Sequence, residues 1–257
     1  PLTVAGLRYF LAFLLLAPWL WSRRVGLSPR AWRRFTAIGL AQYTVGNGAL
    51  FWSLQTLSAT AGSLSLSLVP IVVLLAEAVW LRERPGALPT LGVVLSVGGS
   101  FLFFSPSVGP GDATALSILG VAILAFAVLP VVGREMARGR EVGTVPLTAI
   151  PLGIGGGVLL VLALAAEGVP RMPLLGWGVI LGLAAVNTAV AYLLYTHALR
   201  HLTATEANVI LNLSPLGTAV IAWAALGERL QPVQVLAMAV VMVGVAMVQV
   251  RKGLGSR

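Results

Sequence analysis

The sequence contains no cysteine and few charged residues. Asp, Glu, Lys and Arg make up 10% of its 257 residues, whereas hydrophobic residues make up 58%. A soluble domain has about 25% charged residues, so this chain has too few charges to cover a surface that faces water. Without cysteine it forms no disulfide and no cysteine-ligated zinc site, and it offers no cysteine nucleophile. The composition therefore excludes a soluble globular protein.

The net charge of +9 would by itself suit a protein that binds nucleic acid. Such a protein gathers its basic residues on one face, whereas here they stand in short stretches between long apolar runs. We therefore expect the lipid bilayer as a partner and no nucleic acid. The sequence also lacks a GxxxxGK[ST] loop for the phosphates of ATP, and we expect no cofactor.

Nine segments are long enough to cross a bilayer as helices, which requires about 20 mostly apolar residues. Their residues do not alternate between apolar and polar, as they would in the strands of a membrane β-barrel. The sequence therefore predicts an all-α integral membrane protein. The segments are 2–21, 33–54, 60–81, 87–105, 113–133, 145–166, 174–198, 204–226 and 232–250.

Capping residues mark where several of these helices begin. Ser28-Pro29, Asp112 and Gln231-Pro232 stand at three of the expected starts, where a polar N-cap and a proline in the first turn are favoured. Thr203-Ala-Thr-Glu206 is predicted to form a capping box, which explains Glu206 better than a substrate site does.

The basic residues predict the orientation of the chain, because cytoplasmic loops are rich in Lys and Arg. If the loop after segment 2–21 is cytoplasmic, 14 of the 17 basic residues lie on that side, Arg171 and Arg229 lie outside, and Arg8 lies within the first segment. We therefore expect a multi-pass protein of the inner (plasma) membrane with a cytoplasmic C-terminus. The cytoplasmic set is Arg23, Arg24, Arg30, Arg33, Arg34, Arg82, Arg84, Arg134, Arg138, Arg140, Arg200, Arg251, Lys252 and Arg257.

The chain matches itself when it is shifted by 145 residues. Pro70 then falls on Pro215 and Glu83-Arg84 falls on Glu228-Arg229, and 10 of the 31 positions from 54 to 84 are identical. An internal match of this kind predicts two structural repeats, residues 1–106 and 112–251, within a single transmembrane domain.

The segment 113–133 has no partner in this comparison, because its partner would precede residue 1. We therefore expect a further helix upstream and ten helices in the complete architecture, of which nine are present. Repeats of five helices must be inserted in opposite orientations. Inverted repeats are typical of transporters, whose substrate site lies near the midplane of the bilayer between the repeats.

The two copies of one motif carry a resemblance to a known family. Each copy is a helix with a central proline that ends near Gly-Glu-Arg and is followed by a helix containing glycine. The first runs from Pro70 through Arg82-Glu83-Arg84, where Arg82 replaces the glycine, and the second from Pro215 through Gly227-Glu228-Arg229. This arrangement is similar to the EamA-type transporters of the drug/metabolite transporter superfamily. Leu7-Arg8-Tyr9-Phe10 likewise resembles the family's Arg-aromatic start to its second helix.

The resemblance implies a secondary transporter that moves small organic metabolites or drugs across the inner membrane by alternating access, with export more usual than import. An intramembrane enzyme and a structural membrane subunit without transport activity are the alternatives. The sequence offers an enzyme no paired acids, no Ser/His arrangement and no metal site, and we expect none.

Polar residues form matching stripes on the segments 60–81 and 204–226. Ser63, Ser67 and Glu77 share one face of a helix. In the internal match at a shift of 145 residues, Ser63 aligns with Asn208 and Ser67 aligns with Asn212. Polar groups inside a bilayer are costly, so we expect these residues to line a substrate cavity. Hydrogen bonding between helices is the alternative.

Three residues of these stripes suggest more specific roles. Glu77 is predicted to bind a cationic group or to carry a proton, and the alternative is an interfacial pair with Arg82 or Arg84. Pro70 and Pro215 are candidate hinges for alternating access, and the alternative is a static kink.

The segments 33–54 and 174–198 carry further candidates for substrate binding. The family resemblance implies that the corresponding helices contribute to the cavity, and for the aromatic residues the alternative is a position at the membrane interface. Arg8 is a candidate for binding a substrate carboxylate, unless its side chain extends outward to the membrane surface. The candidates on the two segments are Gln42, Asn47, Asn187, Tyr192 and Tyr195.

Two other patterns favour structural interpretations. His197 and His201 have the spacing of a metal-ligand pair, but two ligands rarely suffice and we expect no metal. The glycines of the run 153–157, together with Gly178 and Gly182, are predicted to allow close helix packing.

Overall fold

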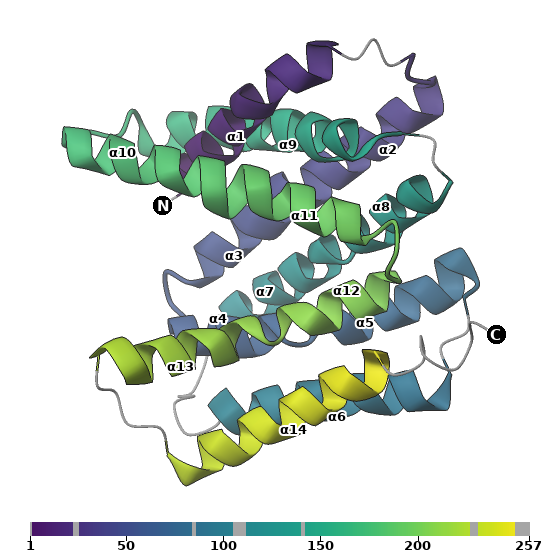
Figure 1. Ribbon diagram of the computed structural model, residues 1–257. Helices are drawn as coiled ribbons and strands as arrows, with labels where there is room; N and C mark the ends of the chain where they lie inside the picture. Colours follow the sequence, from purple (N-terminus) through teal and green to yellow (C-terminus); the bar gives the residue numbers. More distant parts are fainter. Residues whose placement is uncertain are drawn as a thin grey trace. The chain divides into compact units, whose positions relative to one another are not determined.

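The computed structural model describes residues 2–22, 26–83, 86–104, 112–139, 142–226 and 231–249. Within these ranges the regular secondary structure is helical throughout (Figure 1), and the nine expected segments are confirmed as helices. Several residues used above lie outside the described ranges, namely Arg23, Arg24, Arg84, Arg140, Gly227, Glu228, Arg229, Arg251, Lys252 and Arg257.

Eight of the helical segments are long and apolar enough to cross a membrane, which confirms a multi-pass membrane protein. The exception runs through α2 (Pro29–Gly39), η1 (Leu40–Gly46) and α3 (Asn47–Ser53). This helix is equally long, but Gln42, Thr44 and Asn47 in its middle make it less apolar. The eight spans are Leu2–Trp21, Thr60–Leu81, Ala87–Phe104, Ala113–Arg138, Thr144–Glu167, Leu174–Ala198, Ala204–Ala225 and Pro232–Gln249.

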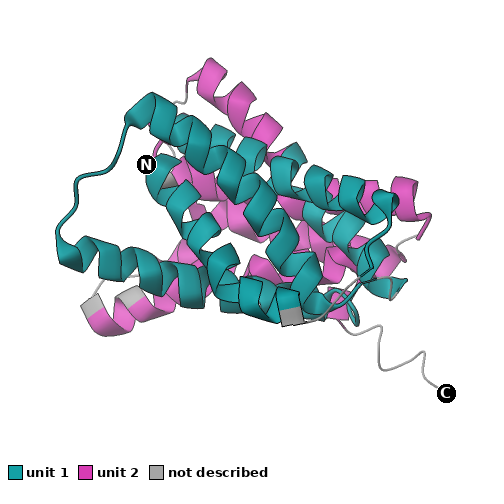
Figure 2. Ribbon diagram, turned by 90° about the horizontal axis from the view of Figure 1, so that it is seen from above, with its two compact units in different colours: residues 1–52, 124–202 teal, residues 53–123, 203–257 magenta. Residues whose placement is uncertain are grey.

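The chain forms two compact units, and each is built from two separate stretches of sequence. Unit 1 consists of residues 1–52 and 124–202, and unit 2 of residues 53–123 and 203–257 (Figure 2). The units cut across the two expected repeats, because helices that the shift of 145 residues relates pack against each other. In unit 1, α1 (Leu2–Ser22) packs against α9 (Thr144–Glu167). In unit 2, α6 (Ala87–Phe104) packs against α14 (Pro232–Gln249).

Glycines allow the close packing of unit 1. A side chain on Gly155 of α9 would collide with the main chain of Gly39 in α2, and a Cβ on Gly156 would lie 2.7 Å from the Cβ of Tyr9 in α1. The prediction for the run 153–157 is therefore confirmed. The prediction for Gly178 and Gly182 is wrong, because a Cβ on either would meet no atom within 4 Å.

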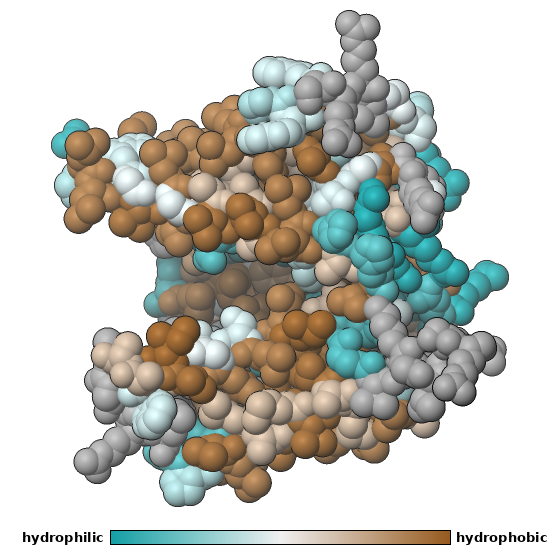
Figure 3. Space-filling model, in the orientation of Figure 1, coloured by the Kyte–Doolittle hydropathy of each residue, from teal (hydrophilic) through white to brown (hydrophobic). Residues whose placement is uncertain are grey.

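Unit 1 also contains three helices that complete its spans. They are α8 (Val128–Arg138), α10 (Leu174–Gly182) and α11 (Ala191–Ala198), with the π-helix η4 (Leu183–Val190) between the last two. Their outward faces are apolar, as Leu174, Val186 and Leu194 illustrate with exposures of 88%, 69% and 66%. Figure 3 shows this apolar cover over α10 and α11. Such faces suit contact with lipid rather than water.

Unit 2 contains α4 (Ala59–Leu66), α5 (Val69–Ala76), the π-helix η2 (Glu77–Leu81), most of α7 (Ala113–Phe126), α12 (Ala204–Leu211) and α13 (Ser214–Leu226). Its core contains Val93, Val97, Val209 and Val241. The helices α6 and α14 touch through glycines, since a Cβ on Gly244 would lie 2.6 Å from a main-chain oxygen of α6. Apolar residues also cover the outward faces of α13 and α14 (Figure 3).

Local backbone features recur at the 145-residue shift. The π-helices η1 and η4 occupy nearly corresponding positions, and the helix breaks at residues 67–68 and 212–213 correspond without an offset. Ser58 and Thr203, which also correspond, are the N-caps of α4 and α12. The internal match in the sequence therefore coincides with a match in local conformation.

Prolines explain the helix breaks. α5 begins one residue before Pro70 and α13 one residue before Pro215, because proline lacks the N–H that would continue the preceding helix. Both prolines thus stand at a helix break, as a hinge and a static kink alike would require. A third break, at Ala127, separates α7 from α8, which begins two residues before Pro130, and no such break was expected from the sequence. Pro18 and Pro151 interrupt neither α1 nor α9.

The predicted caps are confirmed where the structure describes them. Ser28 Oγ accepts a hydrogen bond from the N–H of Ala31 at 3.2 Å, and Asp112 Oδ1 accepts one from the N–H of Thr114 at 2.9 Å. Thr203 and Glu206 form the reciprocal capping box, at 3.1 and 2.9 Å. α14 begins at Pro232, directly after Gln231.

Candidate functional site

Unit 1 holds a group of buried and half-buried polar and aromatic side chains, which we call the tyrosine–amide cluster. It lies where α1, η1 and the junction of η4 with α11 come together. Its members are Arg8, Tyr9, Gln42, Tyr43, Asn47 and Tyr192. Polar residues inside membrane spans are rare and face either a protein partner or a cavity, so this cluster is the first candidate for a functional site.

Hydrogen bonds link the cluster in one direction. Arg8 Nη2 donates to the hydroxyl of Tyr9 at 2.6 Å, and that hydroxyl donates to Asn47 Oδ1 at 2.7 Å. Asn47 Nδ2 then donates to the main-chain oxygen of Gln42 at 2.7 Å. The chain of donors starts at a cation, so each hydroxyl and amide dipole along it is oriented by the next.

Three tyrosine rings hold the cluster together. The ring centroids of Tyr9 and Tyr43 lie 5.0 Å apart, and those of Tyr43 and Tyr192 lie 5.3 Å apart in an edge-on arrangement. These are favourable geometries for aromatic pairs. Tyr9 and Tyr43 are each 1% exposed, so their rings fix the positions of the polar groups between them.

The π-helical turns help to position the amides. In η1 the wider turn precedes Asn47, whose side chain reaches back five residues to the carbonyl of Gln42. In the second half of the chain, Tyr192 follows η4, and its hydroxyl accepts a hydrogen bond from Gln42 Nε2 at 3.3 Å. π-helical turns inside α-helices occur frequently at functional sites.

Two buried polar atoms of the cluster have no hydrogen-bond partner among the residues that the structure describes. They are Gln42 Oε1 and Arg8 Nε. Gln42 as a whole is 9% exposed. A buried polar atom without a partner costs about 1–3 kcal/mol. The cluster therefore keeps one acceptor and one donor that the fold itself does not use for hydrogen bonds.

The remaining candidates of unit 1 lie differently. Tyr195 is half-buried on α11, and Asn187 is exposed on η4. Asn187 corresponds to Gln42 by the internal match, yet only Gln42 is buried in the cluster. Tyr9 was quoted above only for the family resemblance and was not expected in the site. The helical spacing of Tyr9 with Ala5, Ala12 and Leu16 was the available signal, since all four are buried on one face of α1.

The polar candidates of unit 2 are hydrogen-bonded within that unit. Ser67, at the helix break, donates to the carbonyl of Leu64 at 2.6 Å, and Asn208 donates to that of Ala204 at 3.2 Å. Asn212, at the corresponding break, donates to Ser96 Oγ at 3.2 Å. All three are buried, whereas Ser63 is exposed. The structure therefore brings Asn212 together with Ser96 rather than with the other candidates.

Glu77 caps a helix in unit 2. Its Oε1 accepts from the N–H of Ala204 at 2.9 Å, and its Oε2 accepts from the N–H of Thr205 at 3.0 Å and from the hydroxyl of Thr205. Glu77 is 5% exposed. These contacts place its charge at the positive N-terminal end of α12, which stabilises a carboxylate, and this partner differs from the Arg82 or Arg84 pair considered above.

Glu167 forms the same arrangement in unit 1. Its oxygens accept from the N–H of Leu2 at 3.0 Å, from the N–H of Thr3 at 2.9 Å and from the Thr3 hydroxyl at 2.7 Å. In both units a carboxylate therefore binds two successive amides and the threonine hydroxyl at the start of another helix. This recurrence marks the motif as a device that joins two helices.

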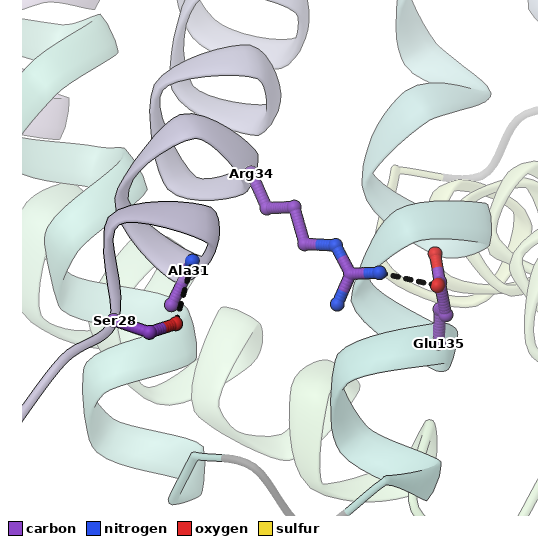
Figure 4. A network of polar contacts seen from close by, with 4 residues as sticks. All are labelled: Ser28, Ala31, Arg34 and Glu135. Carbon is purple, nitrogen blue, oxygen red and sulfur yellow. Dashed lines mark hydrogen bonds and ion pairs between the residues drawn. The ribbon is translucent and has the colours of Figure 1, made fainter.

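Ionic contacts near the start of α2 join it to α8 (Figure 4). Arg34 Nη2 pairs with Glu135 Oε1, while Ser28 caps the first turn of the same helix. Arg134, next to Glu135, donates to the carbonyl of Leu199 at 2.8 Å beyond the end of α11. These basic residues therefore connect helix ends within unit 1.

The described residues include no group of three or more side chains suited to hold a metal ion. The rings of His197 and His201 lie 5.4 Å apart on an exposed stretch.

The helical spans define a multi-pass membrane protein. The chain belongs to the EamA-like transporter family, whose model matches residues 1–105 and 113–250. It is 26% identical over 246 residues to an uncharacterized transporter of Archaeoglobus fulgidus, a match that covers 95% of this chain and 85% of the relative. A solved structure described only as "Crystal structure of protein" shares the fold, with a TM-score of 0.82 at 15% identity over 98% of this chain and 89% of that one.

Proposed function

We propose that this membrane transporter moves small organic molecules, metabolites or drugs, across the inner membrane by alternating access, and that it exports them. The observation that carries the proposal is the tyrosine–amide cluster of unit 1, with its buried Gln42 Oε1 that has no partner. The cost of burying such an atom is recovered when a ligand supplies the missing hydrogen bond.

The contrast with the polar residues of unit 2 supports this assignment. Ser67 and Asn212 use their side chains to satisfy a helix break or to join two helices, which is the ordinary role of polar residues between membrane helices. We therefore propose Gln42, Asn47 and Tyr192 as the main substrate-binding residues. The secondary positions are Ser63, Ser67, Glu77, Asn187, Tyr195, Asn208 and Asn212.

We also propose that the two halves of the sequence are inverted repeats and that Pro70 and Pro215 act as hinges between inward-open and outward-open states. The support is that both prolines end a helix at corresponding positions and that π-helices recur at nearly corresponding positions. Helices that are interrupted in matching places of two halves are typical of transporters that alternate access.

The orientation follows from the basic residues, and we propose that the loop after α1 and the C-terminus are cytoplasmic. The chain has no cysteine, so single introduced cysteines report the topology cleanly. In intact cells a membrane-impermeant maleimide is expected to label Val169→Cys, after α9, and not Gly26→Cys, before α2. The opposite pattern would reverse the proposed orientation.

A flux assay in vesicles tests the function. The purified protein is reconstituted into liposomes loaded with a small-molecule extract of cells, and released compounds are identified by mass spectrometry. We expect saturable release of specific compounds, accelerated when the same compound is added outside. Gln42→Leu is expected to reduce this release about fivefold or more, whereas the matched control Gln249→Leu, at the end of α14, keeps it. Formation of a chemically altered product instead would favour an intramembrane enzyme.

A further inference from the structure

The position of Arg8 carries information about the charge of the substrate. Arg8 lies within the span Leu2–Trp21, away from both of its ends. One nitrogen of its guanidinium donates to the hydroxyl of Tyr9, and its Cζ lies 4.7 Å from the centroid of the Tyr9 ring. Its Nε is buried without a partner. The side chain is therefore held toward the cluster rather than extended along the surface of α1.

The acidic residues in the described part of unit 1 are engaged elsewhere. In the described part of unit 1 the acids are Glu135, which pairs with Arg34, and Glu167, which caps α1 through Leu2 and Thr3. No carboxylate of the described residues pairs with Arg8. Arginines inside membrane spans pair with an anion or mark a substrate pathway, so the guanidinium of Arg8 lacks the anion that this position calls for.

The second unused atom has the opposite character. Gln42 Oε1 is a neutral acceptor, because Gln42 Nε2 already donates to Tyr192. Hydrogen bonds lead from Arg8 through the side chains of Tyr9 and Asn47 to the main-chain oxygen of Gln42, the residue that carries the unused acceptor. The cluster therefore contains both a cation and an acceptor that needs a donor.

We infer that the transported substrate is a small organic carboxylate with a separate hydrogen-bond donor: the carboxylate binds the guanidinium of Arg8 and the donor binds Gln42 Oε1. This inference rests on the proposed transport function. A planar guanidinium matches the two oxygens of a carboxylate, and the like charge of a purely cationic substrate would be repelled. The fully buried Tyr9 ring holds the guanidinium in place for this contact.

The experiment compares matched compounds in the reconstituted protein. The labelled probes are lactate and mandelate, their uncharged amides lactamide and mandelamide, phenylacetate (mandelate without its hydroxyl donor) and the cation tetraethylammonium. We expect saturable uptake of at least one hydroxy acid, at least about tenfold faster than that of its amide. Mandelate is expected to exceed phenylacetate by about fivefold, the effect of one unmade hydrogen bond.

Variants assign the two contacts. Arg8→Met is expected to abolish hydroxy-acid uptake, and Arg8→Lys to retain part of it because the charge remains. Arg30→Met, which removes an exposed arginine of α2, is the matched control. Gln42→Leu is expected to bring the ratio of mandelate to phenylacetate uptake close to one. This ratio is measured within one variant, so it does not depend on how much of that variant folds.

The outcomes separate this inference from the proposed function. Saturable transport of an amide as fast as that of its acid, saturable transport of tetraethylammonium, or release of extract compounds none of which is a carboxylate overturns the inference while transport itself stands. Hydroxy-acid uptake that persists in folded Arg8→Met also overturns it. Absence of any saturable movement, from the extract or from the probes, overturns the proposed function and the inference together.

Discussion

The two compact units use the same kinds of polar residue for different purposes. In unit 2, Asn212 and Ser67 have hydrogen-bond partners at the helix breaks. In unit 1, Gln42 is tied to Tyr192 through its nitrogen only, and its oxygen is left unpartnered. A polar residue inside a membrane span is therefore not by itself a sign of a binding site. The sign is a buried polar atom whose capacity the fold leaves unused.

Helix capping, in contrast, is common to both units. Glu77 in unit 2 and Glu167 in unit 1 each bind two successive amides and a threonine hydroxyl at the start of a helix. The units thus resemble each other in how their helices are joined and differ in the side chains left free to meet a ligand. The following changes test that division.

The largest effect is expected from filling a glycine contact. Gly155→Leu forces a side chain against the main chain of Gly39, where no rotamer offers relief, and we expect a loss of more than about 3 kcal/mol or no folded protein. Gly244→Leu in unit 2 is expected to behave alike. The measurement is monodisperse yield and thermal unfolding in detergent. Gly178→Leu is the control, because a Cβ there meets no atom within 4 Å, and it is expected to keep the wild-type yield and unfolding temperature.

The second effect concerns the two capping carboxylates. Glu77→Ala leaves the amides of Ala204 and Thr205 buried without acceptors, which costs about 1–3 kcal/mol for each. Glu167 is exposed, so water replaces its side chain and Glu167→Ala is expected to cost less than about 1 kcal/mol. Thermal unfolding of the two variants checks the order. Equal losses would contradict the difference in burial.

Glu77→Gln separates capping from proton coupling. The amide keeps an acceptor for α12 but cannot gain or lose a proton. If Glu77 only caps α12, the dependence of substrate flux on external pH is expected to match the wild type, and only the stability of the protein is expected to fall. A flux that no longer responds to a proton gradient would instead assign Glu77 the coupling role that its position on the polar stripe suggested.

Tyr9→Phe and Asn212→Ala compare the units most directly. Tyr9→Phe removes the hydroxyl that links Arg8 to Asn47, so we expect substrate flux to fall about tenfold with a modest loss of stability. Asn212→Ala removes a contact to Ser96 and is expected to reduce stability by about 1 kcal/mol while flux per folded molecule is kept. The reverse result would move the candidate site to unit 2.

The smallest effect is expected at the ion pair of Arg34 and Glu135. Their side chains are 14% and 31% exposed, so water screens the charges and a double-mutant cycle with Arg34→Met and Glu135→Gln should give a coupling below about 1 kcal/mol. A larger coupling, measured by thermal unfolding, would mean that the α2–α8 junction contributes more to the stability of unit 1 than the burial of its side chains indicates.

Much of the fold could be predicted because it depends on local signals. Apolar runs of sufficient length determine the spans, and Ser28, Asp112 and the Thr203–Glu206 pair determine helix starts through contacts within a few residues. The breaks before Pro70 and Pro215 follow from the missing N–H of proline. The break before Pro130 obeys the same rule, but it lies within one continuous apolar run, so the sequence predicted an unbroken helix there.

The candidate site could be predicted only in part, because it depends on contacts between distant residues. Gln42, Asn47 and Tyr192 were identified as polar or aromatic residues within spans. Their partners were not, since Tyr9 meets Asn47 across 38 positions of the chain. From the sequence alone, Gln42 and Asn187 were equally good candidates for substrate binding, whereas in the structure Gln42 is buried and Asn187 is exposed. Glu77 likewise has its amide partners 127 and 128 residues away.

The interleaving of the two units sets an order for their assembly during synthesis. Residues 1–52 belong with residues 124–202, so this stretch leaves the ribosome long before the rest of its unit. In the meantime the stretch 53–123 emerges, and its own complement begins only at residue 203. Each unit therefore stays incomplete for a time: the amides of Leu2 and Thr3 lack their acceptor until Glu167 is made, and Glu77 lacks its amide partners until α12 is made.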